Sequence, residues 1–261
     1  MNALDLFLWA IFPYICAVLF VAGLVWRWRT DQFGWTARSS QLHESKLLRL
    51  GSPLFHFGII FVLLGHLMGL IIPKSWTNAL GISEHSYHLV ATIGGTLAGL
   101  MTITGIVLLI IRRIRYPGVR HATTHNDKIM YVLLCLPIAL GAFATAQNQI
   151  FGVPGGYDYR ETISVWLRSL FVFQPKVELM ASVPLSFKLH IIAGLLLVAM
   201  VPFTRLVHSV TPPVGYVTRP YVVYRSREAD VTTSATAKGW KPLDGVQPRD
   251  QGRHDAHAQG A

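Results

Sequence analysis

Long runs of apolar residues, separated by short polar segments, dominate most of the chain. Five runs are long enough to be membrane spans, at residues 3–26, 53–73, 87–111, 129–147 and 185–210. A helix needs about 20 apolar residues to cross the hydrocarbon core of a bilayer. The pattern therefore predicts an all-α fold, an integral membrane bundle of five transmembrane helices, within a domain of residues 1–225.

The polar segments between the runs differ in positive charge, and the difference predicts an orientation. Residues 27–50 and 112–128 carry five Lys or Arg each, whereas residues 74–86 carry one and the longer segment 148–184 carries three. Cytoplasmic segments have the excess of Lys and Arg. We therefore expect a multi-pass protein of the cell inner (plasma) membrane, surrounded by lipid, with its N-terminus outside and its C-terminus in the cytoplasm.

Three further segments complete this topology. No basic residue precedes Arg27, whereas a signal peptide begins with a positive region, so we expect the first run to remain as a membrane helix. The apolar stretch from Ile163 to Phe173 is too short to cross a bilayer and predicts an interfacial helix. Residues 226–261 have few large apolar side chains and predict a disordered cytoplasmic tail.

Composition narrows the functional classes. The chain is 52% hydrophobic and 14% charged, against about 25% charged for an ordinary soluble domain. The net charge is +10, but the 23 Lys and Arg residues form short clusters between apolar runs, which indicates membrane topology and argues against nucleic-acid binding. Cys16 and Cys135 both lie in apolar runs, so the chain has neither a disulfide framework nor a C-x-x-C motif.

Four of the 11 histidines lie inside predicted spans: His56 and His66 in the second, and His190 and His208 in the fifth. Ionisable groups in hydrocarbon usually serve a function, although a neutral histidine bonded between helices is the alternative. On ideal helices, His190 and His208 share one face about 27 Å apart, and His56 and His66 are about 15 Å apart. Antiparallel packing then places His66 beside His190 near the outer surface and His56 beside His208 near the inner one.

Two imidazole pairs at two depths suit the axial positions of two non-covalently held haem irons, whereas copper or zinc would need further ligands. Glycines near the histidines would leave room for a flat macrocycle, although helix packing also explains glycines. They are Gly58, Gly65, Gly69, Gly94, Gly95, Gly99 and Gly194. Arg205, Arg112 and Arg113 would hold haem propionates or extend toward the inner interface, and the two roles are compatible.

Distinct motifs surround these histidines and occur at the start of the chain. They read Phe12-Pro13-Tyr14-Ile15, Ser39-Ser40-Gln41, Leu54-Phe55-His56-Phe57-Gly58-Ile59, Gly65-His66 with Gly69 and Pro73, Lys188-Leu189-His190, Pro202-Phe203-Thr204-Arg205-Leu206-Val207-His208 and Pro213-Val214-Gly215-Tyr216. Over residues 1 to about 228, the motifs resemble the gamma subunit of membrane-bound respiratory nitrate reductase. The four histidines fall where that family has its haem ligands.

The resemblance implies a cytochrome b with two b haems that oxidises quinol, either menaquinol or ubiquinol, near the outer surface. Electrons would pass to an iron-sulfur beta subunit and then to a molybdenum alpha subunit that reduces nitrate. Some family members have a quinol-facing lysine before the third span, where this chain reads Glu84-His85-Ser86-Tyr87-His88.

His85 or His88 would replace that lysine, because a neutral imidazole accepts a proton near physiological pH. The alternative is that both are hydrated loop histidines. We also expect Gly65 and Gly69 to open space for the quinol next to His66.

Two other functions fit the sequence. The first is the cytochrome b subunit of a sulfite-reductase-linked or heterodisulfide-reductase-linked membrane complex, which neighbouring genes would distinguish. The second is a haem-free transporter or scaffold whose histidines join helices. A reduced-minus-oxidised optical spectrum would distinguish the haem-free protein from a cytochrome b.

Overall fold

The computed structural model describes residues 2–31, 34–35, 40–152 and 157–210. All of them belong to one compact unit, Met1–Pro212. Within these ranges the regular structure is entirely helical. The tail expected at 226–261 lies outside the described residues, as do Ser39 and the motif that begins at Pro213.

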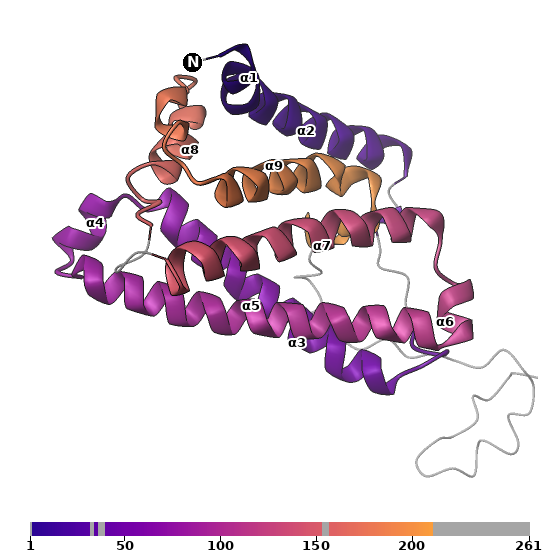
Figure 1. The fold of residues 1–261 in the computed structure, drawn as a ribbon. Helices are drawn as coiled ribbons and strands as arrows, with labels where there is room; N and C mark the ends of the chain where they lie inside the picture. The colour runs from indigo at the N-terminus through magenta and orange to yellow at the C-terminus, as the bar shows by residue number, and fades with distance from the viewer. Residues whose placement is uncertain (1, 32–33, 36–39, 153–156, 211–261) are drawn as a thin grey trace, which may run out of the picture. The chain divides into compact units, whose positions relative to one another are not determined.

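Five helices are long and apolar enough to cross a membrane, which confirms the predicted all-α fold with five membrane-length helices. They cover Ala3–Thr30, Lys46–Ile71, Glu84–Arg115, His125–Ile150 and Leu185–Phe203. The elements of the chain, labelled in Figure 1, are α1 (Ala3–Leu6), η1 (Phe7–Ile11), α2 (Phe12–Thr30), α3 (Lys46–His66), η3 (Leu67–Ile71), α4 (Lys74–Ala79), α5 (Glu84–Arg115), α6 (Pro117–His121), α7 (His125–Thr145), η4 (Ala146–Ile150), α8 (Ile163–Phe171), η5 (Val177–Met180), α9 (Leu185–Met200), η6 (Val201–Phe203) and η7 (Arg205–Val210).

Polar residues at the helix starts explain where several elements begin. The side chains of Asn2 and Thr124 accept backbone N–H groups of Asp5 and Asp127, whose carboxylates bond back to form capping boxes. Ser83 caps α5 in the simpler way, because its hydroxyl accepts the N–H of the third residue of the helix. These caps set the starts of the first, third and fourth membrane-length helices.

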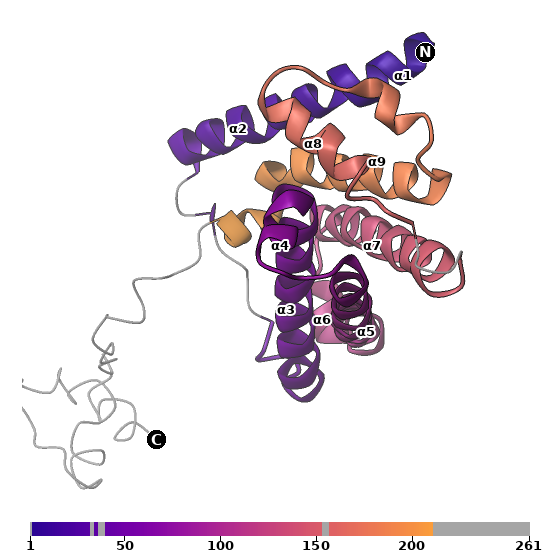
Figure 2. The same ribbon diagram turned by 90° about the vertical axis from the view of Figure 1, so that its left-hand side faces the viewer.

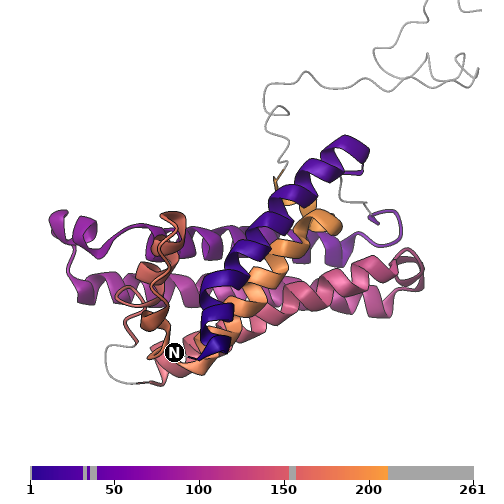
Figure 3. The ribbon, with the colours of Figure 1, turned by 90° about the horizontal axis from the view of Figure 1, so that it is seen from above.

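The helices pack as two neighbouring groups. In one group α3 lies against α5, and in the other α9 lies between α2 and α7 (Figures 1 and 2). From above, α2 and α9 run side by side (Figure 3). Close approach of α3 and α5 needs Gly58, where an added Cβ would lie 2.6 Å from the backbone nitrogen of Thr102. The two groups face each other across the histidines.

The short helix α8 stands where an interfacial helix was expected, and its apolar side packs on the first membrane-length helix. Trp166 Nε1 donates a 2.8 Å hydrogen bond to the carbonyl of Trp9, and the two rings meet edge to face with centroids 5.7 Å apart. Tyr14 Oη donates to the carbonyl of Leu170 at 2.9 Å. This cluster, with α4 nearby, defines one end of the bundle, called the α8 end here. The opposite end, with α6, is the α6 end.

Candidate histidine-pair site

The four intramembrane histidines form two facing pairs between α3 and the segment that runs from α9 to η7. The ring centroids of His66 and His190 are 5.8 Å apart, and those of His56 and His208 are 6.3 Å apart. His66 is the last residue of α3, toward the α8 end, and His56 lies ten residues earlier on the same helix. The structure thus brings together the residues that the antiparallel argument pairs.

Each of the four imidazoles donates a hydrogen bond from Nδ1 to a backbone carbonyl. The acceptors are Ser52 for His56 and Val62 for His66, both at 2.7 Å, Pro137 for His190 at 2.9 Å, and Arg205 for His208 at 2.5 Å. A carbonyl only accepts, so Nδ1 carries the proton and the lone pair is on Nε2. An imidazole binds a metal in this state, and the Nδ1 hydrogen bond orients it.

The geometry of the pairs fits ligation of a haem iron. Two metal–nitrogen bonds of about 2 Å each place facing imidazole nitrogens about 4 Å apart, and the ring centroids lie further apart by the size of the rings. Centroid distances of 5.8 and 6.3 Å therefore accommodate one metal in each pair. Within the described ranges, neither pair has a third His, Cys, Asp or Glu ligand. Two imidazoles suit a haem iron, because the macrocycle supplies the other ligands.

Open space surrounds most of the glycines that the sequence places near the histidines. An added Cβ would meet nothing within 4 Å at Gly65, Gly94, Gly95, Gly99 and Gly194. Such positions, on α3, α5 and α9, leave backbone surfaces that a flat macrocycle or a quinol ring would cover. Gly69 is different, because an added Cβ there would lie 2.7 Å from Tyr159 Oη. The expected opening beside Gly69 is therefore wrong, since Tyr159 fills it.

Two residues of α7 that the sequence pattern does not identify as site residues determine the position of His190. An added Cβ at Gly141 would lie 2.8 Å from Cε1 of His190, so only glycine leaves room for the ring there. The carbonyl of Pro137, one turn earlier, accepts the Nδ1 hydrogen bond. The sequence signal for this role was a glycine four residues after a proline inside an apolar run.

His208 does not lie on the fifth helix, contrary to the expectation of one continuous span over 185–210. The α-helix α9 ends at Met200, η6 adds a single 3₁₀ turn, and Thr204 is extended before η7 begins. Pro202 contributes to this ending because it has no N–H to continue the helix. The inference that His190 and His208 share one helical face about 27 Å apart is therefore wrong.

Contacts from other helices hold the segment that carries His208. Arg27 Nη1, on α2, donates to the carbonyls of Pro202 at 2.7 Å and Thr204 at 2.9 Å. Arg205 Nε forms an ion pair of 2.7 Å with Asp127 at the start of α7, and the Asp127 side chain is 0% exposed. Tertiary contacts thus replace helical geometry in positioning the fourth histidine.

Arg112 is tied to the polar segment before α3. Its side chain is 2% exposed and donates to the Glu44 carboxylate at 2.6 Å and to the Ser40 hydroxyl at 2.8 Å. Burial alone raises the pKa of Glu44, but hydrogen bonds from the Leu47 N–H and from Arg112 leave it below its ordinary value. Arg112 and Arg205 both have carboxylate partners within the chain, and contact of either with a propionate stays a prediction.

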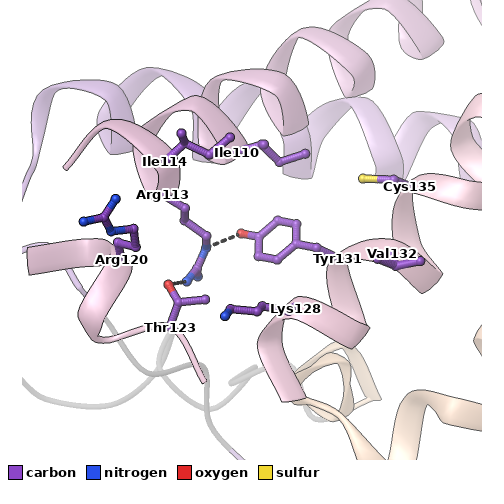
Figure 4. Close-up of a pocket in the computed structure, with 9 residues that line it drawn as sticks. All are labelled: Ile110, Arg113, Ile114, Arg120, Thr123, Lys128, Tyr131, Val132 and Cys135. Carbon is purple, nitrogen blue, oxygen red and sulfur yellow. Dashed lines mark hydrogen bonds between the residues drawn. The ribbon is translucent and has the colours of Figure 1, made fainter. Parts of the chain in front are cut away.

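A basic cavity of about 460 Å³ lies at the α6 end, between α5, α6 and α7 (Figure 4). Arg113 donates to Tyr131 Oη at 2.9 Å and to Thr123 Oγ1 at 2.8 Å, and Arg120 and Lys128 also line the space. None of the four paired histidines lines it. The Arg113 guanidinium therefore has partners in this cavity, separate from the histidine pairs.

The two histidines at the start of α5 have different surroundings. His88 is half-buried, and its ring nitrogen and carboxylate oxygens of Glu84 and Asp158 lie within 4.8 Å of one another. His85 is exposed. The structure thus separates two residues that the sequence treats alike.

Five membrane-length helices with two facing histidine pairs between them define this chain as an integral membrane helix bundle. The model of the family described as nitrate reductase gamma subunit matches residues 5–227, and the chain belongs to this family.

Several curated relatives support this family membership. The "Nitrate reductase-like protein NarX" of Mycobacterium tuberculosis is 51% identical over 233 residues, which are 89% of this chain and 35% of that protein, so the chain spans about a third of its length. The "Nitrate reductase gamma chain" of Bacillus subtilis is 44% identical over 84% of this chain and 97% of its own. The "Respiratory nitrate reductase 1 gamma chain" of Escherichia coli is 32% identical over 87% and 100%.

Proposed function

We propose that the chain is the membrane cytochrome b subunit of a respiratory nitrate reductase. It oxidises quinol at the outer side and passes electrons through two b haems to an iron-sulfur beta subunit, which supplies a molybdenum alpha subunit that reduces nitrate. The observation that carries the proposal is that the four histidines face each other two by two, and each ring has its Nε2 lone pair available. Membership of the gamma subunit family favours nitrate reductase over the sulfite- and heterodisulfide-linked alternatives.

His66 with His190 and His56 with His208 would each hold one haem. A bound haem supplies a centre that takes and gives one electron at a time. The protein contributes orientation, because every ligand ring is fixed by its Nδ1 hydrogen bond. Ten residues separate His56 from His66 on α3, which corresponds to about 15 Å along the helix axis. One helix therefore links both centres.

The distribution of Lys and Arg supports an orientation in the membrane, from which we infer the direction of electron flow. The segments 27–50 and 112–128 lie in the cytoplasm under the positive-inside rule. The α6 end, with His56 and His208, then faces the partner subunits, and the α8 end, with His66 and His190, faces outward. Quinol would bind beside His66, where Gly65 borders open space, and His85 or His88 would accept protons there.

The test is a reduced-minus-oxidised optical spectrum of the purified complex. We expect two b-type haems per chain, both reduced by a menaquinol analogue in stopped-flow measurements. Absence of any haem spectrum would support the scaffold alternative. Haems that dithionite reduces but quinol does not would remove quinol oxidation from the proposed function.

A further inference from the structure

A compact group of charged residues surrounds Glu84 at the α8 end. Its carboxylate oxygens lie 3.6 Å from Lys74 Nζ and 3.7 Å from Arg160 Nη1. Lys74 Nζ also lies 3.1 Å from an Asp158 oxygen and 2.9 Å from a Glu161 oxygen. The residues come from α4, from the start of α5 and from the segment before α8. Three separate parts of the chain thus meet in one group of charges.

Several buried polar atoms in this group have no hydrogen-bond partner among the described residues. Arg160 is 2% exposed, and of its side-chain nitrogens only Nη2 donates a hydrogen bond, to Thr77 Oγ1 at 3.1 Å, while Nε and Nη1 have no hydrogen-bond partner. Both Glu84 oxygens are buried and unpaired, and their ion pairs are too long to be direct hydrogen bonds. Buried groups of this kind normally bond to ordered water or to a ligand. The group is therefore suited to exchange hydrogen-bond partners and protons.

Positive and negative charges are equal in number around this group. Lys74 and Arg160 supply two positive charges, and Arg168, which interacts electrostatically with Glu161, supplies a third. Glu84, Asp158 and Glu161 supply three negative charges. Hydrogen bonds to Glu161 and then to Asp158 raise the pKa of Lys74, so Lys74 keeps its proton. Both Glu84 oxygens lack a direct hydrogen bond among the described residues, so this carboxylate is open to a new partner.

Other titratable side chains face the same carboxylate. His88 follows Glu84 by one helical turn, and one of its ring nitrogens lies within 4.8 Å of carboxylate oxygens of Glu84 and Asp158. The ring of Tyr87 lies under Arg160, with the guanidinium carbon 3.9 Å from the ring centroid. Burial raises the pKa of Tyr159, which keeps this hydroxyl protonated. His88 is therefore the imidazole that lies next to the group.

Tyr159 connects the charged group to the first histidine pair. Gly69 follows His66 by three residues, less than one turn of helix, and faces Tyr159 Oη. Ser164 Oγ donates to the carbonyl of the same glycine at 3.1 Å. Tyr159, which lies between Asp158 and Arg160 in the chain, thus reaches a glycine that is within one helical turn of His66.

We propose that His88 and Glu84 form the route by which protons leave the quinol site, with Asp158 and Glu161 as the exit to water. The inference rests on the proposed function. Oxidation of one quinol to quinone releases two protons and two electrons, and the two proposed haems would accept the electrons. Each proton passes in turn to the His88 imidazole or the Glu84 carboxylate and then to the solution. The side chains of Asp158 and Glu161 are 36% and 59% exposed, against 33% for Glu84, whose carboxylate oxygens are buried, so Glu161 offers the most exposed carboxylate of the group.

The decisive variant is Glu84→Gln in the assembled complex, with haem reduction by a menaquinol analogue followed in stopped flow. We expect unchanged haem content and dithionite-reduced spectrum, with quinol-driven haem reduction slowed by about 10²-fold, the typical contribution of one proton-transfer group. Added imidazole, a small mobile base, should restore much of the rate. A purely structural defect would not respond to it. Glu84→Asp should retain most of the unmodified rate.

Glu178→Gln is the matched control, because Glu178 is an exposed glutamate in η5, in the connection assigned to the same side of the membrane. It should behave as the unmodified chain. Full quinol-driven rates in Glu84→Gln, or slow rates that imidazole leaves unchanged, would overturn the proton route and leave the proposed function intact. If Glu84→Gln loses haem, the same measurement on Asp158→Asn tests the proton route. A full rate of quinol-driven haem reduction in Asp158→Asn would overturn the route. Failure of quinol to reduce haem in the unmodified chain would instead overturn the proposed function.

Discussion

The two histidine pairs use the same donor atoms but are positioned by different means. His66 and His190 both lie on α-helices, and space for the His190 ring comes from Gly141 on a third helix. In the other pair, His56 lies on α3, whereas His208 lies on the 3₁₀ segment η7, which follows the end of α9. An ion pair to Asp127 holds this segment. The first pair should therefore be sensitive to added volume and the second to altered charge.

The largest effect is expected from replacing the paired histidines themselves. His66→Ala and His190→Ala should each remove the same haem, whereas His56→Ala and His208→Ala should each remove the other. The reason is that each proposed haem has two histidines to hold it and no further His, Cys, Asp or Glu beside them within the described ranges. The measurement is haem content with the optical spectrum of each variant.

His121→Ala is the control for these variants, because His121 is an exposed histidine of α6, and it should keep both haems. If His56→Ala removed the same spectral component as His66→Ala, the pairing would be wrong. In addition, quinol should no longer reduce the inner haem when His66 or His190 is replaced, because electrons are proposed to enter at the outer pair.

The next largest effect is expected at Gly141. Gly141→Val places side-chain carbons where the His190 ring now lies, since even a Cβ would be 2.8 Å from its Cε1. Because packed interiors resist added volume, we expect the ring to be displaced and the haem of the His66 pair to be lost, with the other retained. Ala139→Val, on an exposed side of the same helix, should keep both. Two intact haems in Gly141→Val would show that the His190 position tolerates movement.

Much of this arrangement was predictable from the sequence, because it depends on local patterns. Apolar runs locate membrane helices, and antiparallel order pairs His66 with His190 without any knowledge of side-chain contacts. The helix break at Pro202, the Tyr159 side chain against Gly69 and the ion pair of Arg205 depend on residues far apart in the chain. Nothing in the periodicity of one segment reports which distant residue fills its open face. The pairing agrees with the structure even though the assumed helix is too long, since contacts from α2 and α7 position η7.

A smaller effect, confined to the second pair, is expected from breaking the ion pair at η7. Removing one partner of a buried ion pair costs about 3–5 kcal/mol, and the low end applies here because the Arg205 side chain is 20% exposed. Arg205→Gln should leave the capping box of α7 intact, shift the electron paramagnetic resonance signal and midpoint potential of the His56 haem, and leave the other haem unchanged. Arg205→Lys should restore part of the signal.

Asp31→Asn is the matched control for this effect. Asp31 is 3.7 Å from Arg27, and its side chain is 55% exposed, so that pair contributes little. The variant should match the unmodified chain in both signals. Equal shifts of both haems in Arg205→Gln would contradict the view that the ion pair serves only the His208 segment.

The smallest effect is expected from removing the C-terminal tail, although the tail follows soon after His208. Within the part of the chain that the structure describes, the side-chain contacts that hold η6 and η7 come from Arg27, Asn126 and Asp127, all of which precede the segment. Residues 226–261 also contain few large apolar side chains that would add to a packed core. Truncation after Arg227 should therefore leave haem content and both electron paramagnetic resonance signals unchanged. Selective loss of the His56 haem in the truncated chain would mean that the 3₁₀ segment needs an anchor from beyond Arg227, and the contrast between the two pairs would then have to include the tail.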